Sequence, residues 1–247
     1  MGSILLVSPR QGAEIAHAEY QDVLRATKLP AAELDHVLLD TPNAQLPNLD
    51  NYRGIIVGGS PLNVTNKNYD AWQQHVHHEL GRLIELDMPV FFVCYGNAFV
   101  VDYFGGTIAR THPETSGPTL VQLTAAGEED PITKNLPASF TSLTGHTENA
   151  VSVPESVILL AQGPTCPIQM VRGNASTWAC QFHAEMDAEG MHRRMDFYYD
   201  YGYFPVAEYD AIIAQLPSID TTYSNKVLQN FVTYCFAQHT TSVRSSV

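Results

Sequence analysis

The 247-residue sequence lacks several features that would assign it to a broad class of protein. It has no apolar run long enough to span a bilayer, and Met1–Val7 is too short for a secretory signal, so we expect neither membrane association nor secretion. Basic side chains are few: 13 Lys and Arg against 26 Asp and Glu give a formal net charge of −13. Because such a chain repels phosphate backbones, we expect no nucleic-acid partner.

Cysteine is also scarce, and its spacing argues against a metal centre. The four cysteines, at positions 94, 166, 180 and 235, show no pairing typical of metal ligands. Without a secretory leader they indicate free thiols in a reducing compartment, which predicts a cytoplasmic protein. The cluster His75, His77 and His78 can be read as a metal site or as the solvated face of a helix. Since no carboxylate–histidine zinc pattern accompanies it, we favour the solvated face.

Internal repeats and low-complexity linkers are absent as well, and what remains is an alternation of strands and helices. The expected strands of a parallel sheet lie at Ile4–Val7, Val37–Leu39, Gly54–Val57 and Val90–Val93, and the expected helices at 13–28 and 70–87. This order predicts an α/β fold. Beyond residue 107 the pattern changes to short strands separated by turn residues, and from Asp187 onward it is helical.

Cys94 is the candidate nucleophile. It ends the apolar run Val90–Val93, and Gly96 follows two residues later. A buried strand, a tight turn and a new helix form the elbow that presents the nucleophile of serine hydrolases. The start of a helix also places partly positive N–H groups near the sulfur, which favours the thiolate. The alternative is a buried cysteine that ends a core strand.

A second strand with a polar end supplies the candidate base. It runs from Thr177 into His183 and Glu185, which are two residues apart and therefore point the same way on an extended segment. A thiol, an imidazole base and a carboxylate that orients the imidazole form the cysteine version of the nucleophile–base–acid triad. We therefore predict that Cys94, His183 and Glu185 are the catalytic residues.

Three segments, in this order, resemble the class I (triad-type) glutamine amidotransferases, above all stand-alone proteins similar to the glutaminase domain of GMP synthetase. They are Gly58–Pro61, Val93–Gly96 and Gln181–Glu185. The resemblance implies a flavodoxin-like three-layer sandwich with a mostly parallel central sheet flanked by helices, plus a small antiparallel extension. It also implies an amidotransferase-like domain at residues 1–186, with a helical C-terminal extension at 187–247 packed on the same domain.

The resemblance further assigns roles to particular residues. The backbone N–H groups of Gly59 and Tyr95 are expected to form the oxyanion hole, although a Gly-rich loop can also be a plain turn. The residues expected to bind substrate are Gly58, Gly96, Asn97, His146, Thr147 and Glu148. His146 can alternatively be a hydrogen-bonded loop histidine without a part in the chemistry. The reaction requires neither a metal nor an organic cofactor.

The chain departs from the family pattern close to the expected nucleophile. Relatives usually have glycine at the position of Phe92, His-Gln at the positions of Asn97 and Ala98, and proline at the position of Ala184. In the family that glutamine side chain helps to bind substrate. Since Ala98 cannot replace its hydrogen bond, we expect free glutamine to bind poorly and a γ-glutamyl peptide to bind at least as well.

Three functions are compatible with these features of the sequence. The first is glutamine hydrolysis that releases ammonia for a separate acceptor enzyme, a synthetase partner in trans. The second is a stand-alone γ-glutamyl peptide hydrolase that acts on a small-molecule substrate without a partner. The third is a catalytically inert binding or regulatory protein on the same fold, and the intact triad argues against it.

Overall fold

The computed structural model describes residues 2–244, with side chains from 2 to 238. Its strands are β1 (Ser3–Ser8), β2 (Leu34–Leu38), β3 (Tyr52–Val57), β4 (Val90–Val93), β5 (Thr107–Ala109), β6 (Glu114–Leu123), β7 (Ser139–His146), β8 (Asn149–Ser152), β9 (Ile158–Gln162), β10 (Met170–Arg172) and β11 (Thr177–Cys180). Its α-helices are α1 (Ala13–Thr27), α2 (Ala71–Ile84), α3 (Tyr95–Tyr103), α4 (Ala125–Glu129), α5 (Ala188–Phe197), α6 (Tyr209–Gln215) and α7 (Thr222–Arg244). Short 3₁₀ helices lie at Ala31–Glu33, Leu49–Asn51, Val206–Glu208 and Leu216–Ser218.

One nine-stranded sheet, in the order β2-β1-β3-β4-β11-β10-β9-β6-β7, organises the molecule. The strands from β2 to β11 are parallel, and from β11 onward each neighbour is antiparallel. β5 and β8 form a separate two-stranded sheet. β11 is the last strand in the sequence, yet it pairs with β4, so that Cys180 lies opposite Val93. Because parallel strands end at the same edge, the residues that follow β4 and β11 come together.

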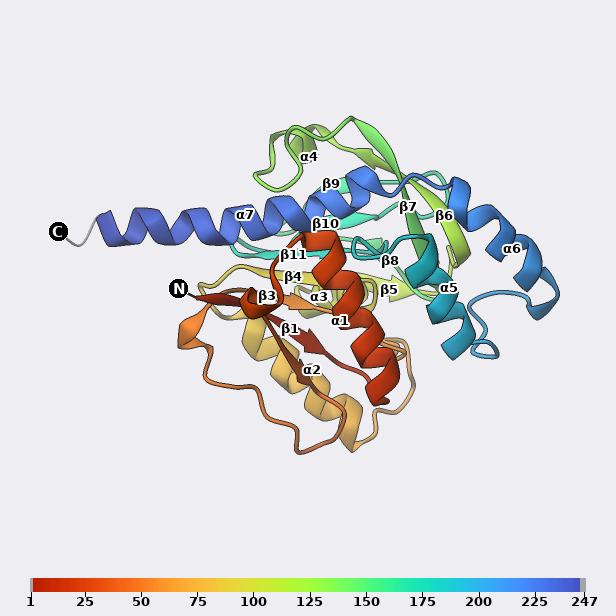
Figure 1. Ribbon diagram of the computed structural model, residues 1–247, viewed down its shortest axis with the longest axis horizontal. Helices are drawn as coiled ribbons and strands as arrows, with labels where there is room; N and C mark the ends of the chain where they lie inside the picture. The colour runs from red at the N-terminus through yellow and green to blue at the C-terminus, as the bar shows by residue number, and fades with distance from the viewer. Residues whose placement is uncertain (1, 245–247) are drawn as a thin grey trace.

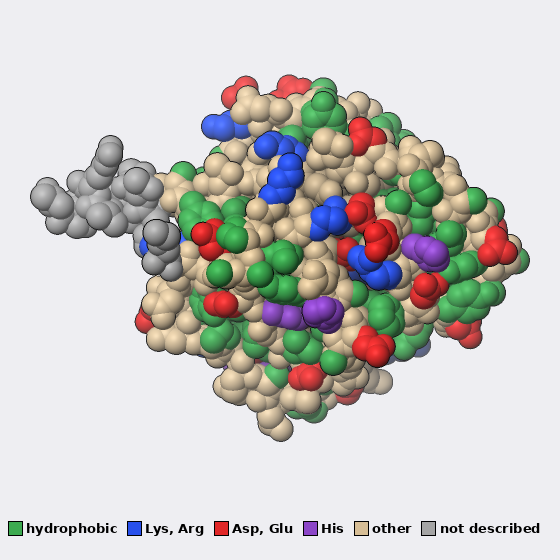
Figure 2. Space-filling view, in the orientation of Figure 1, with side chains coloured by type: hydrophobic (Ala, Val, Ile, Leu, Met, Phe, Trp, Pro, Cys, Tyr) green, Lys and Arg blue, Asp and Glu red, His purple; other side chains and the backbone are tan. Residues whose placement is uncertain are grey.

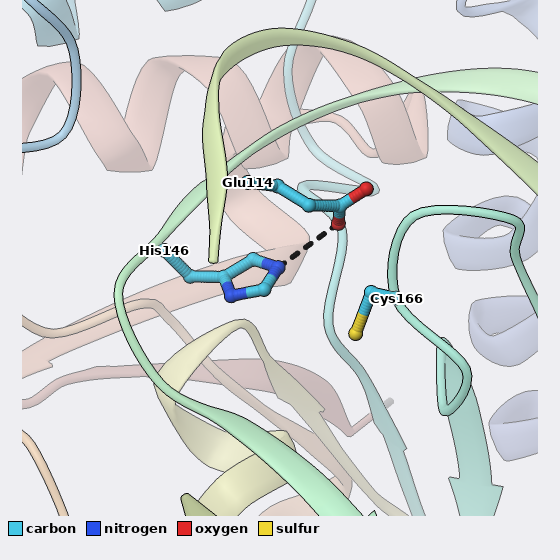
Figure 3. Close-up of side chains that lie close together, drawn as sticks. All are labelled: Glu114, His146 and Cys166. Carbon is cyan, nitrogen blue, oxygen red and sulfur yellow. Dashed lines mark hydrogen bonds and ion pairs between the residues drawn. The ribbon is translucent and has the colours of Figure 1, made fainter. Parts of the chain in front are cut away.

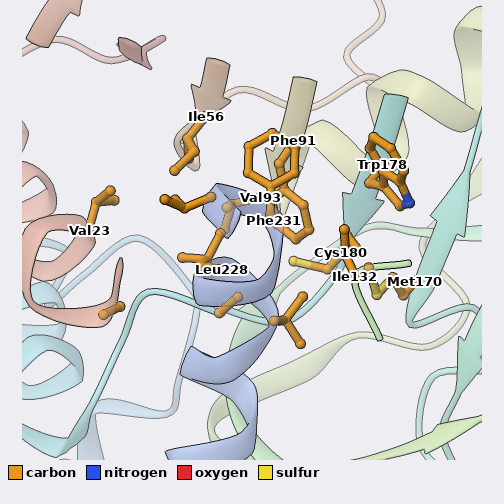
Figure 4. Close-up of a cluster of buried hydrophobic side chains, with 14 of the residues drawn as sticks. Val23, Ile56, Phe91, Val93, Ile132, Met170, Trp178, Cys180, Leu228 and Phe231 are labelled. Atoms are coloured by element: carbon orange, nitrogen blue, oxygen red, sulfur yellow. The ribbon is translucent and has the colours of Figure 1, made fainter. Parts of the chain in front are cut away.

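Helices cover both faces of the parallel part (Figure 1). Successive residues of β1 alternate between the two faces, as the pleat requires. Ile4 and Leu6 pack with α1 and α7, whereas Leu5 and Val7 pack with α2 and α3. Figure 4 shows the first of these clusters, in which side chains of α1 and α7 meet those of the sheet. The expected α/β three-layer sandwich is thereby confirmed.

The expected antiparallel extension is also present. Its strands β10, β9, β6 and β7 continue the main sheet. Strand β7 ends at His146, so this histidine lies in a strand and not on a loop. Strand pairing with β6 holds it in place, with Glu114 opposite His146.

The C-terminal helices complete the core. On α7, the Phe231 ring lies 5.4 Å from the Phe91 ring of β4. α5 lies against α1 (Figure 1), and Arg193 of α5 forms an ion pair of 2.8 Å with Asp22 of α1. Acidic and basic side chains accordingly lie side by side on this face of the molecule (Figure 2). The division at residue 186 stays a prediction, and positions 245–247 of the expected extension lie outside the described residues.

Two expectations from the sequence concern membrane-spanning segments and free cysteine thiols. Within residues 2–244, no helix combines the length and the apolar character that a bilayer span needs. All four cysteines are buried and free of disulfide bonds.

Candidate active site

Cys94 occupies a sharp turn between β4 and α3. Its φ of 53° and ψ of −97° make it one of three described non-glycine residues with positive φ, a conformation that side chains rarely adopt. The Cys94 N–H donates to the carbonyl of Cys180 at 2.7 Å, which ties the turn to β11. Gly96 allows the turn to close, because a Cβ there would lie 2.5 Å from Cβ of Phe92. The strained backbone therefore holds the thiol away from the strand.

Cys94 and His183 line one pocket, which we call the arginine pocket. Its other walls include Arg10, Met191, Arg194, Tyr198 and Phe204. The empty space between these residues is about 440 Å³, open solvent at the mouth included.

Glu185 determines which nitrogen of His183 is free. Nδ1 of His183 lies 2.8 Å from Oε1 of Glu185. A carboxylate only accepts hydrogen bonds, so Nδ1 carries the proton and Nε2 keeps a lone pair. The His183 backbone N–H donates to the carbonyl of Leu143 at 2.8 Å, which fixes the residue against β7. The histidine thus has the tautomer that a general base needs.

Hydrogen bonds from two helices hold the backbone next to His183 and Glu185 in place. Nδ2 of Asn225, on α7, donates to the carbonyls of Ala184 at 2.8 Å and Met186 at 3.0 Å. Nη2 of Arg25, on α1, donates to the carbonyl of Glu185 at 2.6 Å. Because the backbone of Ala184–Met186 is tied down on both sides, the orientation of His183 and Glu185 depends on helices distant in sequence.

Burial and nearby charges set the protonation of the three groups. Burial raises the pKa of Cys94 to about 12, although Arg194 opposes this effect. Burial also lowers the pKa of His183, with Arg194 adding to it and Glu185 opposing it. Burial acts to raise the pKa of Glu185, but His183 and Arg194 outweigh it and hold that pKa at about 2. At neutral pH the site therefore contains a thiol, a neutral imidazole and a carboxylate.

Gly59 and Tyr95, the expected oxyanion donors, both lie beside this group. A Cβ at Gly59 would stand 3.3 Å from Cε1 of His183 and 3.3 Å from Nη1 of Arg194. The Gly59 N–H has no acceptor among residues 2–244, whereas the neighbouring Gly58 N–H donates to Val7. Tyr95 is the first residue of α3, and its N–H lies close enough to the Cys94 sulfur to lower the pKa of the thiol. The Gly59 N–H is thus available, whereas the Tyr95 N–H faces the Cys94 sulfur, and the role of both donors stays a prediction.

The six residues expected to bind substrate fall into two groups. Gly58 packs against the carboxylate of Glu19, Gly96 packs against Phe92, and Asn97 donates to Oε1 of Gln181 at 3.3 Å. These contacts are structural, and none of the three lines either pocket beside Cys94. The other three do line a second pocket, which we call the Ala98 pocket; its walls include Cys94, Tyr95, Ala98, His146, Thr147 and Glu148. Cys94 therefore lies between the two pockets.

Comparison with known proteins agrees with this arrangement. The family model described as glutamine amidotransferase class-I matches residues 20–197, more than half of the chain. The chain belongs to the class I glutamine amidotransferase family.

Among curated relatives of this chain are the glutamine-hydrolyzing GMP synthases of Helicobacter pylori (strain Shi470) and Aliivibrio fischeri (strain MJ11), 27% and 30% identical over 134 residues. Each alignment covers 54% of this chain and 24% of the relative, so the chain spans about a quarter of the length of these relatives. A solved glutamine amidotransferase from Thermotoga maritima covers 95% of this chain and 98% of its own, with a TM-score of 0.75 and 15% identity. A putative GMP synthase subunit from Thermoplasma acidophilum covers 98% of both chains, with a TM-score of 0.67 and 20% identity. At these identities the solved structures establish the fold alone.

The protein contains a second Cys–His–Glu group, formed by Glu114, His146 and Cys166 (Figure 3). Their ligand atoms lie within 4.8 Å of one another, and no other described group of His, Cys and acidic residues is close enough to share a metal. Oε2 of Glu114 lies 2.9 Å from Nε2 of His146, and the carbonyl of Glu148 lies 2.8 Å from Nδ1. Burial acts to raise the pKa of Glu114, but hydrogen bonds from His146 and neighbouring threonines hold it at about 2.

Both ring nitrogens of His146 are engaged by these contacts. Nε2 faces the Glu114 carboxylate and Nδ1 faces the Glu148 carbonyl. Burial and Glu114 raise the pKa of Cys166 to about 12. The contact between Glu114 and His146 joins β6 to β7 beside the Ala98 pocket.

The sequence analysis did not identify the two arginines of the arginine pocket as site residues. Nη2 of Arg10 lies 2.6 Å from Oε1 of Glu19 and donates to the carbonyl of Gly59 at 2.5 Å. Arg194 lies on α5 with Nη1 at 3.4 Å from both nitrogens of His183. One signal was present: Arg194 lies three residues after Met191 and four before Tyr198, on the apolar stripe of its helix, where a charged residue is unexpected.

Proposed function

We propose that the protein hydrolyses the side-chain amide of glutamine or of a γ-glutamyl compound, with Cys94 as nucleophile, His183 as base and Glu185 as the residue that orients it. The observation that carries the proposal is the placement of Cys94 at a strained strand–helix elbow, in one pocket with a His183 whose Nδ1 is held by Glu185. Membership of the class I glutamine amidotransferase family supports the same reaction class.

The mechanism follows from the protonation of the resting site. The thiol of Cys94 is neutral, so Nε2 of His183 takes its proton as the sulfur attacks the amide carbon. The N–H groups of Gly59 and Tyr95 stabilise the oxyanion. The imidazolium, stabilised by Glu185, then protonates the departing nitrogen, and the carbon–nitrogen bond breaks. His183 next activates a water that hydrolyses the thioester, which releases glutamate and restores the thiol.

The proposed reaction is compatible with two functions. Relatives named as glutamine-hydrolyzing GMP synthases support delivery of ammonia to a synthetase. Ala98 supports the second candidate, a stand-alone γ-glutamyl hydrolase. Its short side chain lines the pocket beside Cys94 and leaves room where relatives of this family have a glutamine side chain.

A labelling experiment tests the role of Cys94. A diazo-ketone analogue of glutamine is incubated with the protein, and the labelled cysteine is identified by peptide mass mapping. We expect label on Cys94, and loss of both label and turnover in Cys94→Ala. Cys166→Ala is the matched control, because Cys166 is also buried beside a histidine and a glutamate and has a similarly raised pKa. Label on Cys166, or turnover that survives in Cys94→Ala, contradicts the proposal.

A further inference from the structure

The two pockets beside Cys94 differ in charge. The Ala98 pocket is lined by Glu148, whose carboxylate accepts from the N–H groups of Val64 at 2.8 Å and Thr65 at 2.9 Å. The arginine pocket has two guanidinium groups in its wall and no acidic side chain among its lining residues. A substrate that occupies both pockets therefore meets cationic groups on the His183 side only.

The two arginines are not equivalent. Arg10 has short contacts within the protein, since its Nη atoms pair with Glu19 and donate to Gly59 and Tyr198, and only its Nε makes no hydrogen bond among the described residues. The contacts of Arg194 are longer. It forms ion pairs with Glu185 at 3.6 Å and with Glu19 at 3.7 Å, both beyond hydrogen-bond distance.

The remaining donors of Arg194 are also without good partners. Its Nε is buried and makes no hydrogen bond among the described residues. Its Nη1 lies 3.4 Å from both nitrogens of His183, at the long end of the hydrogen-bond range. A guanidinium has five N–H donors in a planar fork that matches a carboxylate. A largely buried guanidinium with free donors at the wall of a pocket is thus a site for an anion.

The position of Arg194 indicates which part of a substrate carries that anion. In the proposed mechanism, Nε2 of His183 protonates the departing nitrogen of the substrate. Nη1 of Arg194 lies 3.4 Å from this Nε2 atom. In an α-amino acid the carboxylate carbon is two bonds from the nitrogen, so its oxygens come within reach of the same guanidinium. Met191, Met195 and Phe204 form an apolar wall beside Arg194, where the rest of the leaving group can pack.

We propose, on the basis of the function proposed above, that Arg194 binds a carboxylate on the leaving group and selects γ-glutamyl amino acids or peptides whose scissile nitrogen belongs to an amino acid with a free carboxylate. Hydrolysis consumes one water, breaks the γ-glutamyl carbon–nitrogen bond and yields glutamate and the free amino acid. Ammonia, the leaving group from glutamine, carries no group for Arg194 to bind.

The test compares two substrates that differ only in this carboxylate, γ-glutamylglycine and γ-glutamylglycinamide, with glutamine as a third. For the wild-type protein we expect kcat/KM to be about 10- to 100-fold higher for γ-glutamylglycine than for its amide, the range of one charge-assisted hydrogen-bonded pair. In Arg194→Gln this ratio falls to about 1, and Arg194→Lys gives an intermediate ratio. Since the measurement is a ratio, a loss of rate common to both substrates cancels.

Arg193→Gln is the matched control, because Arg193 is adjacent on α5 but pairs with Asp22 and Glu189 away from the pocket. It keeps the wild-type ratio. If Arg194→Gln is too slow to assay, the dissociation constants of both substrates are measured in Cys94→Ser and in Cys94→Ser/Arg194→Gln. The same loss of discrimination is expected.

The outcomes separate this inference from the proposed function. Hydrolysis of glutamine that depends on Cys94, with equal kcat/KM for γ-glutamylglycine and its amide in the wild-type protein, overturns the inference and leaves the function standing. Discrimination that persists in Arg194→Gln also overturns it. Hydrolysis of none of the three substrates overturns both.

Discussion

Asn225 offers a test of how the candidate base is held in place. It lies on α7, 42 residues after His183 in the sequence, and it is 9% exposed. Its side chain donates to the carbonyls of Ala184 and Met186, both fully buried, and accepts from Nη1 of Arg25 at 3.1 Å. Replacing Asn225 with alanine removes three hydrogen bonds at once.

The expected loss of stability in Asn225→Ala comes from the two carbonyl groups that lose their hydrogen-bond donor. A buried polar group left without a partner costs about 1–3 kcal/mol, so two cost about 2–6 kcal/mol. Water that enters the vacated space recovers part of this, and Arg25, whose side chain is 37% exposed, retains Asp187 and the Glu185 carbonyl as partners. We therefore expect Asn225→Ala to lower the free energy of unfolding by about 2–4 kcal/mol. Because the His183–Glu185 segment loosens, kcat falls by about 10- to 100-fold.

Urea denaturation measures the first effect, and a change in midpoint with an unchanged slope identifies it as a change in stability. Steady-state kinetics with the folded variant measures the second. Asn230→Ala is the matched control: Asn230 is on the same helix and donates one hydrogen bond of 3.0 Å, to Ile132, far from the site in sequence. It should cost about 1 kcal/mol and leave kcat unchanged. A loss below about 0.5 kcal/mol in Asn225→Ala, or full stability loss with wild-type kcat, refutes the reasoning.

Three further predictions concern the pocket. Protonated His183 cannot accept the thiol proton, so kcat/KM falls as the pH drops through the pKa of His183. Glu185→Gln removes a charge that raises this pKa and should move the acid limb of the pH profile to lower pH. Arg194→Gln removes a charge that lowers this pKa and should move the acid limb to higher pH. A shift in the same direction for both variants contradicts the electrostatic assignment. The double variant Cys94→Ala/His183→Ala should lose no more activity than the more damaging single change, and additive losses in log kcat would show that the two do not act together. Ala98→Gln should lower the KM for glutamine and not for a γ-glutamyl peptide; an unchanged KM for glutamine marks Ala98 as neutral.

Much of the fold could be predicted because its signals are local. The apolar runs at β1, β3 and β4 predicted buried strands, since a strand covered on both faces must be apolar throughout. The place of β11 could not be found in the same way. It pairs with β4 across more than 80 residues of sequence, and no residue in either strand specifies its neighbour. The order of the antiparallel strands within the main sheet likewise left no local signal.

The candidate site, like the fold, could be predicted from the sequence only in part. Cys94, His183 and Glu185 could be proposed from short motifs because strand ends and a tight turn leave a local pattern, and the roles themselves stay predictions. The hydrogen bonds of Asn225 could not be foreseen, because they depend on how α7 packs. Asn97 was expected to bind substrate, yet its side chain turns toward Gln181, a direction decided by the start of α3.

The sequence by itself determined the elements, the alternation of faces and the chemical types of the reactive groups, because these depend on composition and spacing over a few residues. Only the tertiary structure decided which charges meet. It brings Arg194 against His183 and Glu185, and it closes Glu114 onto His146, so that the two histidines have different charged neighbours. The physical reason is that the protonation of a buried group depends on partners a few ångströms away, and chain topology supplies those partners.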